Sequence, residues 1–196
     1  MFGQGSLCDA GCVRWIEVGL GESCMCHNWS STGDSSGDSK GNVMPLGEAP
    51  PQIVPKSLGD YLEIQTKAVF QSGMSWKVVE SKWPTIREAF HDFQIGAIAA
   101  MDETAVDALT DDRRVIRNRR KLQAITDNAR RMIELDEEYG SFQKYLRSHD
   151  SFWDLVKDLR KQFKFMGEMG CYYWMYVVGE DVPDHDQFEA ERTTKK

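Results

Sequence analysis

Apolar residues recur every three or four positions along almost the whole chain after Ser57, and this period most constrains the fold. Leu58, Tyr61, Leu62 and Val69 begin the pattern. Such spacing places apolar side chains on one face of an α-helix, whereas a half-buried strand needs strict alternation. No stretch combines strand alternation with hairpin turns, and no internal repeat is evident. The sequence therefore predicts an all-α fold.

Residues that start or stop helices divide this pattern into segments. Glycine and proline interrupt helices or open them, and Ser, Asp and Asn favour the position just before a helix. A wholly apolar and aromatic last helix is expected over residues 168–178. The other predicted boundaries are a break at Gly73, Pro84 in the first turn of a helix, N-caps at Asp102, Ser141 and Ser151, a helix that begins after Asn118, and a stop at Gly179.

The first 56 residues differ in composition from the rest. Residues 28–57 are rich in Ser, Gly, Asp and Pro, a composition that buries too little apolar surface to order itself. We expect residues 1–56 to be a disordered leader or linker, with the part before Met44 possible upstream sequence from an early start codon. Residues 57–189 form the predicted helical domain, and residues 190–196 a charged tail.

Cysteine and hydropathy patterns exclude several classes. Cys8, Cys12, Cys24 and Cys26 have spacings unlike those of a zinc knuckle, and a disulfide framework does not suit the remaining chain. Cys171 is expected to be a small buried apolar residue. No run of eighteen apolar residues occurs, so no membrane-spanning helix is predicted. We expect a cytoplasmic monomer.

A basic run stands out in an acidic chain of net charge −7. Residues 113–131 contain eight Arg and Lys and one acid, Asp127. A basic turn before an exposed helix N-terminus attracts phosphate, through both its side chains and the helix dipole. A solvated, salt-bridged helix face is the plainer interpretation. The predicted phosphate-binding residues are Arg113, Arg114, Arg117, Arg119, Arg120 and Lys121, together with Lys164, which could instead only cover apolar surface.

Six short motifs occur in order along the chain. They are QSGMSW (71–76), AFHDF (89–93), AIAAM (97–101), VIRNRRKLQAITDNA (115–129), FKFMG (163–167) and CYYWM (171–175). This ordered set resembles DNA-3-methyladenine glycosylase I, a bacterial base-excision repair family with an all-helical, helix-hairpin-helix architecture. The resemblance covers roughly residues 58–185. It is specific because the motifs occur in the same order as in the family.

The resemblance implies a hydrolase that flips an alkylated purine such as 3-methyladenine out of double-stranded DNA and cleaves its N-glycosidic bond. A cationic base stacks favourably on indole, so Trp76 is expected to line the base pocket. Tyr172, Tyr173 and Phe165 are candidates for the opposing wall, although such an aromatic stripe also suits a core. Catalytic residues are not identified by the motifs; a lysine nucleophile at Lys67 is a weaker possibility.

The chain departs from the family at two sites. The family has a base-recognition glutamate five residues before the glycine of its QAGLSW motif, and that position is Ala68 here. Glu63 lies five residues further upstream, about 140° around a helix, and is a poor replacement. The family's zinc site ends in a histidine and a cysteine. His185 can match the first of these, but Glu189 stands at the second, so neither a metal nor another cofactor is expected.

Three functions therefore remain open. The first is a monofunctional glycosylase acting on alkylated double-stranded DNA, which the retained Trp76 favours. The second is a non-catalytic descendant that senses lesions, which Ala68 favours. The third is a helical interaction protein whose basic face meets an acidic protein partner. Binding to duplex DNA that weakens steeply with salt would exclude the third.

Overall fold

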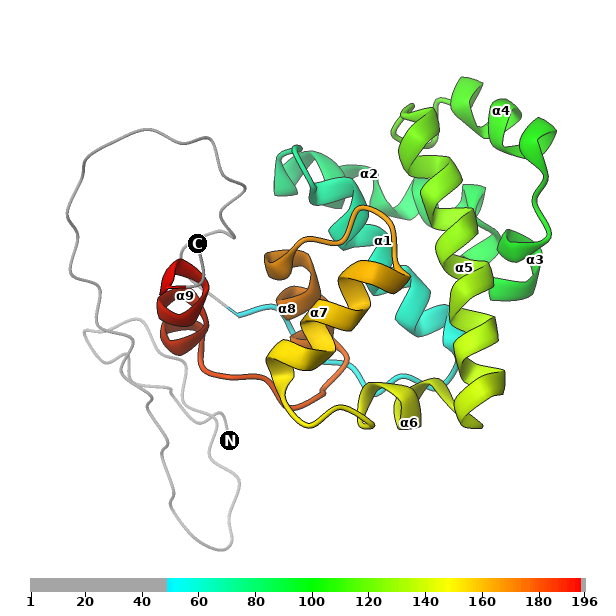
Figure 1. The fold of residues 1–196 in the computed structure, drawn as a ribbon. Helices are drawn as coiled ribbons and strands as arrows, with labels where there is room; N and C mark the ends of the chain where they lie inside the picture. The colour runs from blue at the N-terminus through cyan, green and yellow to red at the C-terminus, as the bar shows by residue number, and fades with distance from the viewer. Residues whose placement is uncertain (1–48, 195–196) are drawn as a thin grey trace, which may run out of the picture. The chain divides into compact units, whose positions relative to one another are not determined.

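The computed structural model describes residues 49–194 (Figure 1). The predicted leader up to residue 48, with Met44 and the four N-terminal cysteines, lies outside the described residues. Within the described part the chain is all-α, as predicted, and has no strand. Its helices are α1 (Leu58–Gln71), α2 (Trp76–Ala89), the 3₁₀ helix η1 (His91–Phe93), α3 (Ile95–Ala99), α4 (Glu103–Asp111), α5 (Arg119–Tyr139), α6 (Phe142–Leu146), α7 (Phe152–Gln162), α8 (Glu168–Val177) and α9 (His185–Thr194).

Helix α5 is the longest element and packs against α1, α3, α4 and α6. Its buried stripe includes Leu122, Ile125, Ala129 and Met132, which recur at the predicted three- and four-residue spacing. Helix α1 crosses the core between α5 and α8 and contacts both (Figure 1). The end of α1 lies at the start of α5, where Lys121 donates to the Phe70 and Ser72 carbonyls, and the start of α2 meets α8 through Trp76 and Tyr173.

Most predicted helix boundaries are confirmed by their capping contacts. Asp102, Asn118, Ser141 and Ser151 each accept a hydrogen bond from a backbone N–H in the first turn of the following helix. Each such cap stabilises the fold by about 1 kcal/mol. The breaks after α1 and α8 are also confirmed: Gly73 and Gly179 have φ angles of 79° and 75°, a region that glycine adopts without a steric penalty.

One predicted boundary is wrong. Pro84 does not open a helix but lies inside α2, which runs without a break from Trp76 to Ala89. Proline removes one backbone donor and crowds the preceding turn, so it usually ends a helix. Here the flanking residues Trp83 and Ile86 are both buried, and their packing against the core offsets that cost.

The ends of the predicted domain are also corrected. Residues 49–56 are not part of a disordered leader, because Ile53 N–H donates to the Val177 carbonyl at 2.7 Å, and the Gln52 amide donates to the Tyr176 carbonyl at 3.0 Å. These contacts satisfy carbonyls at the end of α8. At the other end, the helix over residues 168–178 is not the last one, contrary to the prediction: α9 follows it and crosses the boundary expected at residue 189. None of the described helices is long and apolar enough to cross a membrane.

Candidate functional site

The QSGMSW motif forms the connection between α1 and α2 and places Trp76 at the first position of α2. The Lys121 ammonium fixes this connection, because it donates to the carbonyls of Phe70 at 2.9 Å and Ser72 at 2.5 Å. Lys121 is only 4 % exposed, and this burial lowers its pKa. The structure therefore contradicts a phosphate contact for Lys121, whose charge is directed at the end of α1.

Trp76 meets Tyr173 of α8 edge to face. Their ring centroids are 5.2 Å apart and the ring planes are inclined by 79°. Tyr173 is buried, whereas Trp76 is partly exposed. The structure thus brings together two of the four aromatic residues expected in the pocket, and it leaves part of the indole open to a ligand.

A carboxylate lies one helical turn beyond Trp76. Glu80 stands four residues further along α2, a spacing that places it on the same helix face. Burial raises the pKa of Tyr173, and the negative charge of Glu80 raises it further. We call Trp76, Tyr173, Glu80 and Lys67 the aromatic–carboxylate site.

Lys67 of α1 completes this site as the counter-ion of Glu80. Its ammonium lies 3.2 Å from the Glu80 carboxylate, and it also lies 4.9 Å from the centroid of the Trp83 ring. The Lys67 side chain is 17 % exposed and that of Glu80 39 %. Lys67 thus contacts the Glu80 carboxylate and the Trp83 indole face from one position, and the contact with the indole does not depend on Glu80.

Position 68, where the family has its base-recognition glutamate, holds an alanine and contributes no charge to this site. Ala68 is buried, and a Cβ atom placed on Gly170 of α8 would lie 3.7 Å from the Ala68 Cβ. Glu63 does not replace it. Its carboxylate accepts a hydrogen bond from the Trp83 indole at 2.9 Å and pairs with Arg87 at 3.6 Å. Both partners lie in the second half of α2, whereas Trp76 is its first residue.

Residues 113–120 of the basic run form most of the connection between α4 and α5 and the first two positions of α5; we call them the basic turn, and α2 holds them in place. Val115 and Ile116 are buried beneath this turn. The Lys82 ammonium donates to the Arg113 carbonyl at 3.1 Å, and the Thr85 hydroxyl donates to the Arg114 carbonyl at 2.8 Å. The helix that carries Trp76 therefore also positions the basic turn.

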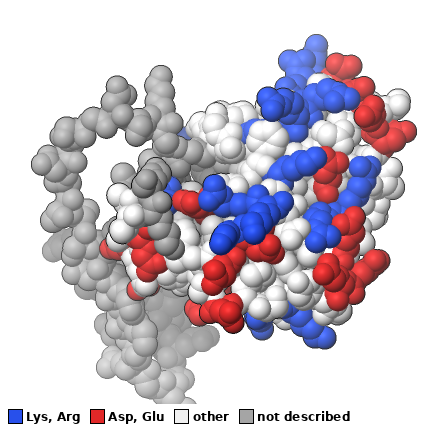
Figure 2. Space-filling view, in the orientation of Figure 1, with Lys and Arg blue, Asp and Glu red and all other residues white. Residues whose placement is uncertain are grey.

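The arginines of this region fall into two groups. Arg114 pairs with Asp112 at 2.7 Å, and Arg119 pairs with Asp107 at 2.5 Å. The others are exposed and form no ion pair with any described residue; they are Arg113, Arg117 and Arg120, which we call the unpaired arginines. Figure 2 shows basic side chains gathered with a few acids at the end of the molecule where α4 and α5 meet.

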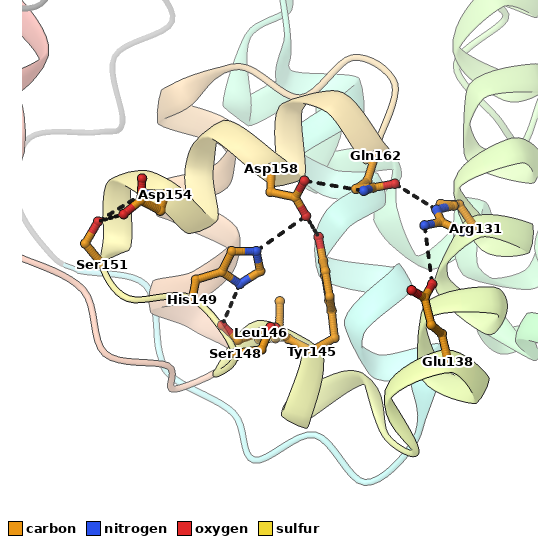
Figure 3. Close-up of polar contacts among 10 residues, drawn as sticks. All are labelled: Arg131, Glu138, Tyr145, Leu146, Ser148, His149, Ser151, Asp154, Asp158 and Gln162. Atoms are coloured by element: carbon orange, nitrogen blue, oxygen red, sulfur yellow. Dashed lines mark hydrogen bonds and ion pairs between the residues drawn. The ribbon is translucent and has the colours of Figure 1, made fainter.

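Arg131, on the second half of α5, forms contacts within the protein. Arg131 donates to the Gln162 side chain at 2.8 Å and pairs with Glu134 at 2.8 Å. Gln162 is in turn linked to Asp158, which accepts a 2.8 Å hydrogen bond from the Tyr145 hydroxyl (Figure 3). Burial raises the pKa of Tyr145, and its hydrogen bond to Asp158 raises it further. This network joins α5, α6 and α7 and leaves Arg131 neutralised.

Two further pocket candidates lie apart from Trp76. Tyr172 stacks on Phe188 of α9, with centroids 4.3 Å apart, and its hydroxyl donates to the Pro183 carbonyl at 3.2 Å. Phe165 lies on the α7–α8 connection, is 39 % exposed, and makes no contact with another aromatic ring of the described residues. Lys164 beside it pairs with Asp127 at 2.6 Å, with its side chain 63 % exposed.

No group of side chains suited to a metal ion occurs in the described part of the chain. His185 lies against the Tyr172 ring, with centroids 6.0 Å apart, and Glu189 pairs with Arg192 at 2.8 Å. Cys171 is fully buried, and burial raises the pKa of its thiol to about 12, so it is not a reactive thiolate at neutral pH.

Sequence reasoning missed the Lys67–Glu80 pair and the contacts of Lys82 and Thr85 to the basic turn. A signal for Glu80 was present in the four-residue spacing from Trp76. The contacts between α2 and the basic turn join residues about thirty positions apart, and no local pattern indicates them.

Comparisons with known proteins agree with the site's motifs. The sequence model of the methyladenine glycosylase family matches residues 61–157. The DNA-3-methyladenine glycosylase of Haemophilus influenzae is 32% identical over 136 residues, which cover 59% of this chain and 73% of that protein. DNA-3-methyladenine glycosylase 1 of Escherichia coli is also 32% identical over 136 residues, with 59% and 72% covered.

Solved structures share the fold. A structure of Staphylococcus aureus 3-methyladenine DNA glycosylase I that concerns recognition of 3-methyladenine has a TM-score of 0.56 and 26% identity. The match covers 67% of this chain and 79% of that one. A solution structure of a 3-methyladenine DNA glycosylase I has a TM-score of 0.56 and 30% identity, with 67% and 82% covered. Sequence and fold together place the chain in the DNA-3-methyladenine glycosylase I family.

Proposed function

We propose that the protein is a DNA N-glycosylase that excises alkylated purines such as 3-methyladenine from double-stranded DNA, the first step of base excision repair. The observation that carries the proposal is the aromatic–carboxylate site, in which a partly exposed indole, a buried tyrosine and a carboxylate lie together. The names of the relatives and the recognition of 3-methyladenine by the S. aureus enzyme support the same substrate.

The chemistry of the substrate fits this site. An N3-alkylated adenine in DNA carries a positive charge, which weakens its bond to the sugar. Trp76 offers a π-face that attracts the cationic ring, an interaction of about 0.5–2 kcal/mol. Glu80 supplies the opposite charge. When the cationic base approaches Glu80, Lys67 keeps its contact with the Trp83 ring, whose centroid lies 4.9 Å from the ammonium.

Cleavage then requires little catalytic acceleration by the protein, because the positive charge of the base already weakens the N-glycosidic bond. The bond between the sugar carbon and the purine nitrogen breaks, and its electron pair neutralises the departing base. Water adds to the sugar carbon and releases its proton to solvent. The aromatic–carboxylate site supports this step by holding the base outside the stack and favouring its cationic form over a neutral purine.

We also assign the basic turn as one half of a helix-hairpin-helix phosphate clamp. Its unpaired arginines and the first backbone N–H groups of α5 are available to phosphate oxygens. Arg114, Arg119 and Lys164 are exposed but must exchange an aspartate partner for phosphate, and Lys121 is excluded by burial. One copy of the chain carries both the clamp and the base site, so we propose that it acts as a monomer.

Base release from methylated duplex DNA tests the function. The full chain is incubated with the duplex and released bases are separated by chromatography; release of 3-methyladenine is expected. Trp76→Ala should slow release by about 10- to 100-fold, the loss typical of one base-stacking contact. Glu80→Gln keeps the shape of the site and removes its charge, and should slow release by a similar factor. Glu88→Gln removes an exposed carboxylate from the far part of α2, outside the site, and is the matched control that should not slow release. Release unaffected by both site variants would place the base pocket elsewhere.

A second function is favoured by one observation. Position 68 holds a buried alanine packed near Gly170, where the family has its base-recognition glutamate. If Glu80 does not substitute for it, the protein binds lesions without excising them. Tight, lesion-selective duplex binding by the full chain without any released base would establish this alternative.

A further inference from the structure

Half of the exposed cations considered for DNA contact have a counter-ion from the chain itself. The unpaired arginines have none among the described residues. The other three cations each lie within 2.7 Å of an aspartate oxygen, a distance typical of charge-assisted hydrogen bonds. We call these aspartates the masking aspartates; they are Asp112, which pairs with Arg114 at 2.7 Å, Asp107, which pairs with Arg119 at 2.5 Å, and Asp127, which pairs with Lys164 at 2.6 Å.

Asp127 lies where three donors converge. Its carboxylate accepts from the Lys164 ammonium at 2.6 Å and from the Gln123 amide at 3.1 Å, and the Arg130 guanidinium lies 3.5 Å away. Arg130 is itself fixed, because it donates to the Ala99 carbonyl at 2.8 Å. Partial burial raises the pKa of Asp127, but hydrogen bonds from Lys164 and Gln123 outweigh it and lower the pKa below its ordinary value. The charged carboxylate therefore occupies the place that an anionic ligand would take among these donors.

Asp112 and Asp107 mask cations near the two ends of the basic turn. The Asp112 carboxylate accepts from two nitrogens of the Arg114 guanidinium, at 2.7 and 3.0 Å, and from the Arg114 backbone N–H at 2.8 Å. Arginine binds phosphate with the same bidentate geometry. Asp107 reaches from α4 to Arg119, the first residue of α5. Both ion pairs thus lie in the segment that carries the unpaired arginines.

The masked and unpaired cations are near enough to contact one duplex. Arg119 and Arg120 are the first two residues of α5. Asp127, which holds Lys164, follows Arg120 by two helical turns on the same face, about 10 Å along the axis. Phosphates of one strand recur about every 3.4 Å along the duplex axis, so this spacing covers about three of them. Release of Lys164 should therefore add a phosphate contact to those of the unpaired arginines.

We propose that the masking aspartates keep their cations off the DNA backbone and thereby limit the affinity of the protein for undamaged duplex. A cation that leaves its aspartate for a phosphate exchanges one anion for another and gains little free energy, while the aspartate is left close to the negative DNA. Phosphate contacts form on every duplex, so their loss weakens non-specific binding and leaves contacts with an extruded base unchanged. This inference rests on the proposed DNA-binding function and adds to it a restraint on non-specific binding.

The test measures binding to undamaged duplex and does not depend on base release. The affinity of the full chain is followed by fluorescence anisotropy of a labelled duplex over a series of salt concentrations. Asp107→Asn, Asp112→Asn and Asp127→Asn each keep the side-chain shape and remove the charge. Each should raise the affinity about two- to fivefold, the equivalent of one exposed ion pair, and steepen the slope of log affinity against log salt by about 0.9.

Asp111→Asn is the matched control. Asp111 is exposed, lies beside Asp112, and forms no ion pair with a described residue. Its replacement removes the same charge without releasing a cation. The affinity should therefore change less than about twofold, because an exposed charge without a close partner is screened by salt. The salt slope should stay that of the wild type.

A double variant shows whether the released cation, and not the lost negative charge, causes the gain. In the wild-type background Lys164→Gln should change the affinity less than about twofold, because Asp127 already holds the ammonium. Added to Asp127→Asn, it should remove the gain in affinity and in salt slope. Lys164→Gln also breaks the ion pair without releasing a cation, so its thermal midpoint reports the effect of that pair on stability.

The outcomes distinguish this inference from the proposed enzyme function. Wild-type affinity and slope in all three Asn variants overturn the inference, as does an equal gain in Asp111→Asn or a gain in Asp127→Asn that persists without Lys164. None of these results affects base release by the aromatic–carboxylate site. Masking in a protein that releases no base supports the inference and contradicts excision alone. Failure of the wild type to bind duplex at low salt overturns both.

Discussion

Neighbouring tyrosines on α8 serve two contrasting regions of the molecule. Tyr173 meets the partly exposed Trp76, whereas Tyr172 is covered by α9. We call the second region the aromatic stack; it consists of Tyr172, Phe188 and Trp153. The Phe188 ring lies parallel to Trp153 at 5.4 Å, and the Trp153 indole donates to Glu191. Polar groups in the aromatic stack already have protein partners.

This contrast shows which aromatic residues remain available for a ligand. In the aromatic stack, ring faces are covered and polar atoms are paired, so these residues contribute to stability. At the aromatic–carboxylate site, the Trp76 indole is partly exposed, and so is the Glu80 carboxylate that pairs with Lys67. The same distinction separates Arg192, which pairs with Glu189 beside the Phe188 ring, from the unpaired arginines. We propose that this availability, and not the residue type, distinguishes the functional region.

The largest expected effect lies in the aromatic stack. Phe188→Ala removes a fully buried ring that contacts Tyr172, Phe152 and Trp153, and should lower the free energy of unfolding by about 3–5 kcal/mol. Urea denaturation followed by circular dichroism measures this change. Base release per folded molecule should persist at low temperature. Loss of release in the folded variant would mean that α9 belongs to the active region.

A smaller effect should connect stability with function. Lys121→Met leaves the carbonyls of Phe70 and Ser72 without their donor, and should cost about 1–3 kcal/mol. Because these carbonyls fix the approach to Trp76, base release should slow even where the variant is fully folded. Its affinity for undamaged duplex should be unchanged, since Lys121 is buried. A decrease in duplex affinity equal to that expected for one phosphate contact would restore Lys121 to the DNA-binding set.

The unpaired arginines should change binding without changing stability. Replacing Arg113, Arg117 and Arg120 by Gln should reduce the slope of log affinity against log salt by about 0.9 for each phosphate that the variant no longer neutralises. The unfolding midpoint should hardly change, because these side chains are exposed. Arg192→Gln is the matched control from beside the aromatic stack and should leave the slope unaltered. An equal decrease in the control would point to overall charge instead of a phosphate clamp.

The sequence predicts the fold better than the site. Periodicity and caps locate almost every helix, because both depend on residues within one turn. The prediction for Pro84 is wrong because the packing of distant residues outweighs its local preference. The order of residues 49–56 cannot be predicted locally, because it comes from carbonyls at the end of α8.

Site residues are harder to predict because their roles depend on partners distant in sequence. Tyr172 and Tyr173 cannot be distinguished by composition, yet one faces α9 and the other Trp76. In the sequence Lys121 belongs to the basic run, which predicts an exposed side chain. In the structure its ammonium instead donates to the carbonyls of Phe70 and Ser72. The resemblance to a family indicated Trp76, whereas the ion pair between Lys67 and Glu80 is visible only in the structure.

The most direct test of the base site follows the indole N–H signals of the ¹⁵N-labelled full chain during titration with 3-methyladenine. Trp76→Phe and Trp153→Phe identify the two signals that matter. We expect the Trp76 signal to shift with saturable binding, whereas the Trp153 signal, from the aromatic stack, should not. A shift confined to Trp153, or none at any indole, would contradict a base site built on Trp76.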